Sequence, residues 1–161
     1  MGKQRKSEVN ALTSKGRIII VDDDNTITTS LSILLQSEGY HTDVVHTGKE
    51  AIEKSHANIY DLAILDIKLP DVEGTSLLTS LRETSPKMIK IMLTGYPMLD
   101  NAVTSLNQGA DAYFIKPVDP TKLLETIKDK IEKQKAAEVA TEANIAVFLK
   151  SKTERLLSEL K

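Results

Sequence analysis

The chain has 161 residues, 40% hydrophobic and 27% charged, which is enough to bury one core of ordinary size in a globular protein. Its 21 Lys and Arg against 23 Asp and Glu give a net charge of −2, which excludes a global attraction to nucleic acid or to an anionic membrane. There is no Cys for disulfides, thiolate metal ligands or thiol nucleophiles, and no apolar run long enough for a membrane span or a signal peptide. We therefore expect a cytoplasmic protein without membrane insertion.

The predicted strands begin after a polar N-terminal segment. Residues 1–16 lack periodicity, so we expect a flexible lead-in, and from Arg17 short apolar runs alternate with stretches of helical period. Four of the five runs are almost continuously apolar, which is typical of parallel strands covered on both faces, whereas the second is weaker and is expected at an edge. The predicted strands are Arg17 to Val21, His41 to Val45, Leu62 to Leu65, Ile89 to Leu93 and Ala112 to Ile115.

Each predicted strand is followed by a predicted helix, and caps mark several of the helix ends. Gly39 ends the first helix, Thr47 and Glu50 form a capping box for the second, and Asp119 with Pro120 starts the fifth. Five strand–helix units with short connections predict an α/β fold with a doubly wound parallel sheet. The apolar stripes of the first, third, fourth and fifth helices contain Ile27, Leu31, Leu34 and Leu35; Leu77, Leu78 and Leu81; Ala102, Val103 and Leu106; and Leu123, Leu124, Ile127 and Ile131.

Polar or charged residues follow four of the strands: Asp22 and Asp23, Asp66, Thr94, and Lys116. Ligands of open α/β sheets bind beyond the carboxyl ends of the strands, where the strand order reverses. An order of 2-1-3-4-5 would bring the three acids together. Such a set of hard oxygen ligands suits Mg²⁺, and a carboxylate beside a cation can attack a phosphoryl group and carry it as an acyl phosphate.

Four motifs in this order resemble the receiver domain of response regulators in two-component signalling. The resemblance covers about residues 17–135 and implies the flavodoxin-like order 2-1-3-4-5, with residues 136–161 as a helical C-terminal extension. The motifs are Val21-Asp22-Asp23-Asp24, the stretch from Leu65-Asp66-Ile67-Lys68-Leu69-Pro70 to Gly74, Leu93-Thr94-Gly95, and Gly109-Ala110-Asp111-Ala112-Tyr113-Phe114-Ile115-Lys116-Pro117.

The resemblance also implies a chemical role for each matching residue. Asp66 would accept a phosphoryl group from a histidine kinase. Mg²⁺, or Mn²⁺ in its place, would be bound by Asp23, Asp66 and the backbone carbonyl of Lys68, with Asp22 completing the metal site mainly through a metal-bound water. Lys116 would pair with the phosphoryl group, and its bond to the next residue, Pro117, would be cis.

A switch and an output are implied as well. Thr94 and Tyr113 would alter the face made by the fourth helix, the fifth strand and the fifth helix, which would contact an effector protein or a second copy. Such a protein is not an enzyme acting on other substrates, since it catalyses only its own phosphotransfer and dephosphorylation.

A rival from another class is a haloacid dehalogenase-like phosphatase. The run Asp22-Asp23-Asp24-Asn25-Thr26 fits its Asp-x-Asp-x-Thr motif, with Asp22 as nucleophile and Asp24 as general acid/base. The rival requires a later strand with further metal-binding acids, and only a helical pattern follows Lys116. Asn25 also replaces the usual Gly. On the receiver interpretation, Asp24 is a solvated acid or a helix cap.

The C-terminal segment has neither Gly nor Pro after Ile131, which predicts helix, with a break near residues 137–142 where Thr141 would cap a separate helix. Mixed charges and a short length disfavour direct nucleic-acid binding. The segment has an apolar stripe that contains Ile145, Leu149, Leu156 and Leu160. Three roles remain open for this stripe: contact with a second copy or a partner, folding back on the domain, or the start of an output region.

Overall fold

The computed structural model describes residues 14–95, 105 and 107–160. The predicted fourth helix, with Ala102, Val103 and Leu106, and most of the N-terminal lead-in fall outside these described residues. Four strands have the predicted bounds, and β4 is one residue longer because Thr94 continues its ladder. The strands are β1 Arg17–Val21, β2 His41–Val45, β3 Leu62–Leu65, β4 Ile89–Thr94 and β5 Ala112–Ile115.

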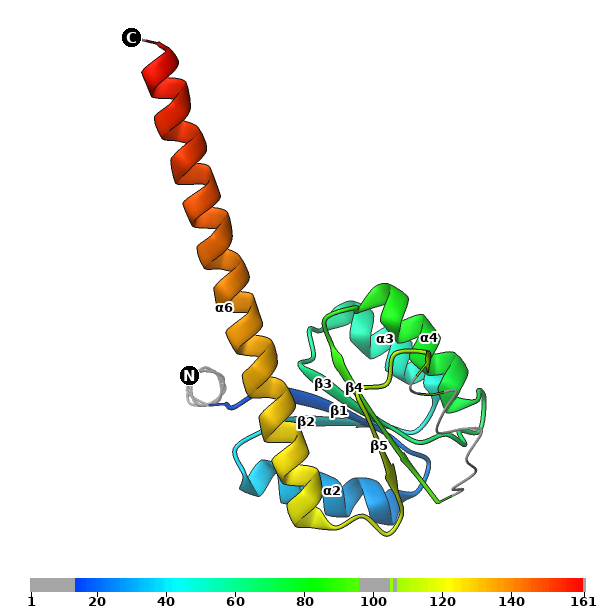
Figure 1. Cartoon of the computed structure of the whole chain (residues 1–161). Helices are drawn as coiled ribbons and strands as arrows, with labels where there is room; N and C mark the ends of the chain where they lie inside the picture. The colour runs from blue at the N-terminus through cyan, green and yellow to red at the C-terminus, as the bar shows by residue number, and fades with distance from the viewer. Residues whose placement is uncertain (1–13, 96–104, 106, 161) are drawn as a thin grey trace, which may run out of the picture. The chain divides into compact units, whose positions relative to one another are not determined.

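The five strands form one parallel sheet in the order β2-β1-β3-β4-β5, so the predicted topology is confirmed. Helices α3 (Gly48–Ala57) and α4 (Gly74–Thr84) cover one face of this sheet, and α2 (Asn25–Ser37) lies on the other (Figure 1). The strand order reverses between β1 and β3, and the carboxyl ends of both strands open at that point.

The predicted caps are present. Asp24 accepts hydrogen bonds from the N–H groups of Thr26 and Ile27 at the start of α2, and Gly39 has a φ of 94° just beyond its end. Thr47 caps α3, and Asp119 caps α6 (Pro120–Glu159). Asp24 is therefore occupied as a helix cap.

The sheet is held by apolar side chains packed against its helices. Strands β1 and β3 are almost wholly buried, and Leu77, Leu78 and Leu81 of α4 are at most 1% exposed in the core cluster with Leu65 and Met92. Burying a leucine of this kind contributes roughly 1.5 to 3 kcal/mol. This packing fixes the strands rigidly enough to position the side chains that follow them.

The predicted break near residues 137–142 is wrong, because α6 is one unbroken helix of 40 residues. The hydroxyl of Thr141 donates to the carbonyl of Ala137 within this helix and caps nothing. The stretch before it lacks an apolar stripe, but its Gln, Lys, Ala and Glu residues are strong helix formers, so loss of periodicity did not mean loss of backbone hydrogen bonding.

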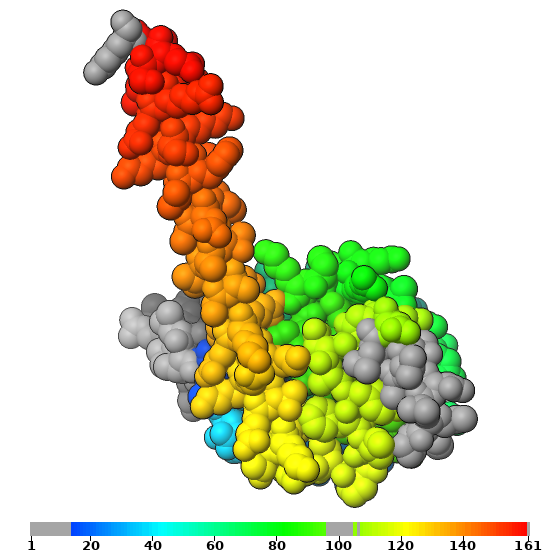
Figure 2. All heavy atoms as spheres, viewed as in Figure 1, coloured from blue at the N-terminus to red at the C-terminus, as the bar shows by residue number. Residues whose placement is uncertain are grey.

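The chain divides into two compact units, residues 1–125 and 126–161. In the second unit all residues from 135 to 160 are exposed, including the stripe from Ile145 to Leu160, and Figure 2 shows the side chains of this segment in orange to red. Among the described residues, no helix combines the length and the apolar character that crossing a membrane requires.

Candidate functional site

The candidate site begins where backbone pairing of the strands extends one residue past β1 and β3. The N–H of Asp66 donates to the carbonyl of Val21 at 2.9 Å, and the N–H of Asp22 donates to Val45 at 3.2 Å. Because Val21 and Leu65 are already register partners, the residues after them also lie side by side. The sheet itself thus places Asp22 next to Asp66.

Three carboxylates meet at this point. Asp22, Asp23 and Asp66 each offer an oxygen, and these oxygens all lie within 4.8 Å of one another. Asp22 is 3% exposed and Asp66 6%, whereas Asp23 is exposed, so the cluster is open to solvent on one side. Carboxylate oxygens are the ligands that Mg²⁺ and Mn²⁺ prefer, and the donor set therefore fits the predicted metal.

Lys116 reaches the same cluster from the end of β5. Its Nζ lies 2.6 Å from Oδ2 of Asp22 and 3.3 Å from Oδ2 of Asp66. Burial opposes the charged form of the ammonium, but the hydrogen bond and the charge of Asp22 outweigh it, so the pKa of Lys116 is raised. The Lys116–Pro117 peptide bond is cis, as predicted.

The charges of the cluster are only partly balanced. Burial and the neighbouring charge of Asp22 raise the pKa of Asp66 above its usual value of 3.8, even though Lys116 and the Lys68 N–H act in the opposite direction. The cluster contains three carboxylates, and Lys116 contributes one ammonium group to it. A divalent cation would relieve this excess of negative charge, which is a second reason why the residues present fit Mg²⁺.

The two predicted switch residues lie on the neighbouring strands. Thr94 is fully buried at the end of β4, and its carbonyl accepts the N–H of Lys116 at 2.7 Å. Tyr113 of β5 is paired with Met92 and packs against the core cluster. Its hydroxyl is buried without a hydrogen-bond partner among the described residues, and burial raises its pKa. Their movement on activation stays a prediction.

Two residues near the site were missed by the sequence reasoning. His46 places Nδ1 2.9 Å from the backbone carbonyl oxygen of Asp22. Asp71 accepts hydrogen bonds from the N–H groups of Gly48 and Lys49 at the start of α3. Its place in a Pro-Asp turn after the third strand was the available signal, but that pattern does not specify a distant partner.

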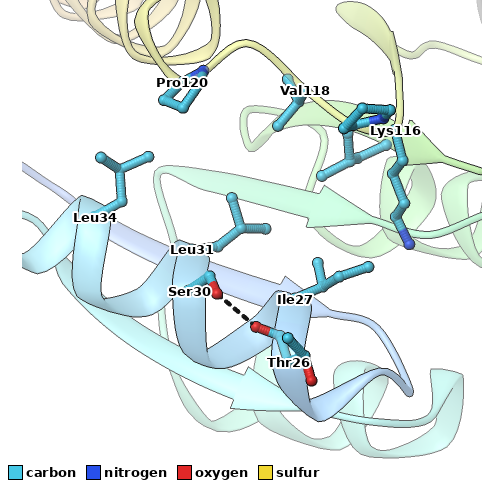
Figure 3. A pocket seen from close by; sticks show the side chains of 10 residues that line it. Thr26, Ile27, Ser30, Leu31, Leu34, Lys116, Val118 and Pro120 are labelled. Carbon is cyan, nitrogen blue, oxygen red and sulfur yellow. Dashed lines mark hydrogen bonds between the residues drawn. The ribbon is translucent and has the colours of Figure 1, made fainter.

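An apolar cavity of about 580 Å³ lies beside the cluster, between α2 and the segment from Lys116 to Pro120. Figure 3 shows Ile27, Leu31 and Leu34 of α2 along it, with the Lys116 side chain at one end. The described residues that line this cavity include no acidic side chain, so the cavity is separate from the three carboxylates. Lys116 is therefore shared between the wall of the apolar cavity and the acid cluster.

Comparison with known proteins gives a consistent result. The family model for the response regulator receiver domain matches residues 18–128. The cell cycle response regulator CtrA of Brucella ovis is 31% identical over 139 residues, which cover 85% of this chain and 60% of that protein. The chain spans 30% to 60% of the length of the first curated relatives it matches.

Solved structures of receiver domains superpose well on this fold. The crystal structure of a CheY-like response regulator receiver domain protein from Methanospirillum hungatei JF-1 is 49% identical, with a TM-score of 0.73 over 75% of this chain and 97% of that one. The solution structure of the beryllofluoride-activated NtrC4 receiver domain dimer is 36% identical, with a TM-score of 0.70 over 73% of this chain and 98% of that one.

Proposed function

The chain belongs to the response regulator receiver domain family, and from this membership we propose that it accepts a phosphoryl group from a histidine kinase on Asp66. The observation that carries the proposal is the geometry of Asp66 itself. This carboxylate directly follows the central strand β3, is buried, and lies beside Asp22 and the Lys116 ammonium. We place the receiver domain at residues 17–135 and regard residues 136–161 as its extension.

The transfer uses one carboxylate oxygen of Asp66 as the nucleophile. This oxygen forms a bond to phosphorus while the bond from phosphorus to the kinase imidazole breaks, and the electron pair of that bond returns to the imidazole nitrogen. Lys116, 3.3 Å from Oδ2, is placed to balance negative charge on the phosphoryl oxygens. The acid cluster is open to solvent on the side of Asp23, so water can reach the acyl phosphate for its later hydrolysis.

Mg²⁺ would be held by Asp22, Asp23, Asp66 and the backbone carbonyl of Lys68, with Mn²⁺ as a substitute. When bound, it supplies positive charge that offsets the repulsion between the acids and the incoming phosphoryl oxygens. The donor set supports this assignment because its oxygens converge within 4.8 Å. The protein would then act in the cytoplasm as a signalling component that catalyses only its own phosphorylation and dephosphorylation.

The output would be a changed surface for an effector protein or for a second copy, with no direct contact to nucleic acid. Two exposed apolar features support this part of the proposal. Ile115 of the edge strand β5 is 51% exposed, and the C-terminal stripe exposes Leu149, Leu156 and Leu160.

The phosphatase alternative makes different demands on the same acids. It needs Asp24 free as a general acid/base, but this carboxylate caps α2, and in the described part of the chain a single helix, α6, follows Lys116 where further acid-bearing strands would be required. The match to the receiver family over residues 18–128 also favours the receiver. We therefore do not propose phosphatase activity.

The decisive experiment locates the phosphoryl group after incubation with Mg²⁺ and acetyl phosphate. We expect one phosphoryl group on Asp66, and no incorporation in Asp66→Asn. The matched control is Asp24→Asn, which preserves the α2 cap because asparagine is an equally good N-cap, and which should be phosphorylated normally. A phosphoryl adduct on Asp22, or loss of phosphoryl incorporation in Asp24→Asn, would support the phosphatase and contradict our proposal.

Dimerisation is tested separately by measuring the mass of the chain in solution with and without beryllofluoride, which stands in for the phosphoryl group. We expect a larger mass with beryllofluoride, and a smaller increase in Leu156→Ser because the apolar stripe is interrupted. An unchanged mass would exclude a phosphorylation-dependent dimer and leave the effector protein as the output.

A further inference from the structure

Asp71 takes no part in the chemistry described above, yet its carboxylate is held at two points. Oδ1 accepts the N–H of Gly48 and Oδ2 accepts the N–H of Lys49, each at 2.9 Å. These hydrogen bonds hold the pKa of Asp71 below its usual value. The first N–H groups of a helix have no partner within the helix, so this carboxylate joins the loop between β3 and α4 to the start of α3.

The rest of this loop is fixed at its base. The N–H of Gly74 donates to the carbonyl of Ile67, and Lys68 pairs with Glu73 as an isolated antiparallel bridge. Gly74 also lies against the backbone of Asp66, where a Cβ atom would not fit. The base of the loop is thereby locked to the phosphoacceptor.

The tip of the loop is held against the turn between β2 and α3. Besides the two bonds of Asp71, the side chain of Val72 packs against Gly48 so closely that a Cβ there would clash. The same turn also touches the other half of the acid cluster, since Nδ1 of His46 lies 2.9 Å from the backbone carbonyl of Asp22. His46, Gly48 and Lys49 therefore connect the two loops that carry the acids.

We propose that Asp71 is a positioning residue for the metal site. By tying the β3–α4 loop to the turn at residues 46–49, it fixes the backbone at Lys68 relative to Asp22. This inference rests on the proposed function, because the Lys68 carbonyl is a ligand only if the acid cluster binds Mg²⁺. A carboxylate is required because both N–H donors need an acceptor, whereas asparagine would offer one oxygen and turn its NH₂ group toward the other donor.

The experiment compares Asp71→Ala with Thr47→Ala in the full chain. Thr47 also caps α3, since its Oγ1 accepts the N–H of Glu50 at 3.1 Å, but it has no hydrogen bond to the β3–α4 loop. Both variants weaken the same helix end, and only the first releases the loop. Mg²⁺ binding is measured by titration of backbone amide NMR shifts, and urea unfolding reports the stability of each variant.

We expect Asp71→Ala to raise the dissociation constant for Mg²⁺ about tenfold, as loss of an outer-shell partner does in other metal sites, while Thr47→Ala changes it less than about twofold. The dissociation constant of Asp71→Asn for Mg²⁺ should lie between those of the unaltered chain and Asp71→Ala. This asparagine variant carries the test if the alanine variant does not fold.

Equal dissociation constants in the two cap variants, or an unchanged constant in Asp71→Ala, would overturn the positioning role while leaving phosphorylation of Asp66 intact. Failure of the unaltered chain to bind Mg²⁺ would overturn both the positioning role and the proposed metal dependence. The two failures are therefore distinguishable in a single titration series.

Discussion

Replacing Lys116 by methionine tests whether the acid cluster is held together by charge. Methionine keeps an apolar stem beside the cavity and removes the ammonium that lies 2.6 Å from Asp22 and 3.3 Å from Asp66. The two carboxylates then face each other without a cation in metal-free protein. We expect the variant to fold but to have a lower free energy of unfolding.

The size of the loss follows from the geometry. The oxygens of Asp22 and Asp66 lie within 4.8 Å of each other, and at that limit two unit charges repel by roughly 3.5 kcal/mol at an effective dielectric of 20 once Lys116 no longer offsets the repulsion. The variant can escape this repulsion by protonating Asp66. Protonating a carboxyl group with the usual pKa of 3.8 at pH 7 costs about 4 kcal/mol, so this value is an upper bound on the loss of stability. We therefore expect a loss of about 3 kcal/mol, or roughly 10 °C in melting temperature.

The assay is urea unfolding followed by circular dichroism at pH 7, with EDTA and with saturating Mg²⁺. Mg²⁺ should restore most of the lost stability, since it supplies the missing positive charge. The control is Lys54→Met, an exposed lysine on α3, which should change the free energy of unfolding by less than about 0.5 kcal/mol. An equal loss in EDTA and in Mg²⁺ would show that packing of the lysine stem, and not its charge, stabilises the site.

The pH dependence of the Lys116→Met variant gives an independent check. The folded pKa of Asp66 is raised above 3.8, so its ionised form lowers the stability of the fold, and this penalty is complete only above the folded pKa. As the pH falls, the penalty shrinks, and it disappears below the unfolded value. The stability difference between the variant and the unaltered chain should therefore narrow toward pH 4, and a constant difference would refute the electrostatic explanation.

Two further predictions concern the support of the site and the opposite edge of the sheet. Gly74→Ala should lower the stability by about 3 kcal/mol, measured by thermal unfolding, because a Cβ would lie 2.7 Å from the Cα of Ile67 and would meet the carbonyl of the phosphoacceptor. Asp43→Asn should lower it by on the order of 1 kcal/mol at pH 7, because the Tyr60 hydroxyl donates to this carboxylate at 2.6 Å. Burial alone would raise the pKa of Asp43, but hydrogen bonds from Tyr60 and Arg17 lower it, so its contribution is present above pH 3.8 and is lost as the pH falls through the folded pKa. Urea unfolding at decreasing pH should show the difference between the two proteins shrinking once the pH is below 3.8, and a difference that stays constant as the pH falls further would contradict the assignment.

The strands were predictable because burial on both faces leaves a strong local signal. A run such as that from Ile18 to Val21 is fully buried in β1, and few structures other than a central parallel strand accommodate four consecutive β-branched residues. The helix break near Thr141 was predicted wrongly because apolar periodicity reports what a helix packs against and says little about whether its backbone continues.

The adjacency of Asp22, Asp66 and Lys116 was predictable for a different reason. Once the strand order is given, parallel register alone brings the ends of β1, β3 and β5 to one edge of the sheet. The contacts of His46 and Asp71 were not predictable in this way. The hydrogen bond between His46 and Asp22 joins residues 24 positions apart in the sequence, and that between Gly48 and Asp71 joins residues 23 positions apart. No local sequence pattern encodes which of these loops touch.

Two kinds of interaction hold the site in place: strand pairing in the sheet and individual hydrogen bonds between the loops. The sheet holds the acids in place, so burial of Asp66 and the charge of Asp22 together raise the pKa of Asp66, and the Lys116 ammonium pairs with both carboxylates. The loops are held by individual hydrogen bonds of modest strength, such as those from Asp71 to the start of α3. A phosphoryl group bound at the cluster would therefore meet acids held rigidly by the sheet, surrounded by loops whose weaker hydrogen bonds allow them to move. A receiver needs both properties, since the phosphoryl group must be bound at a fixed place and its arrival must still alter the surface.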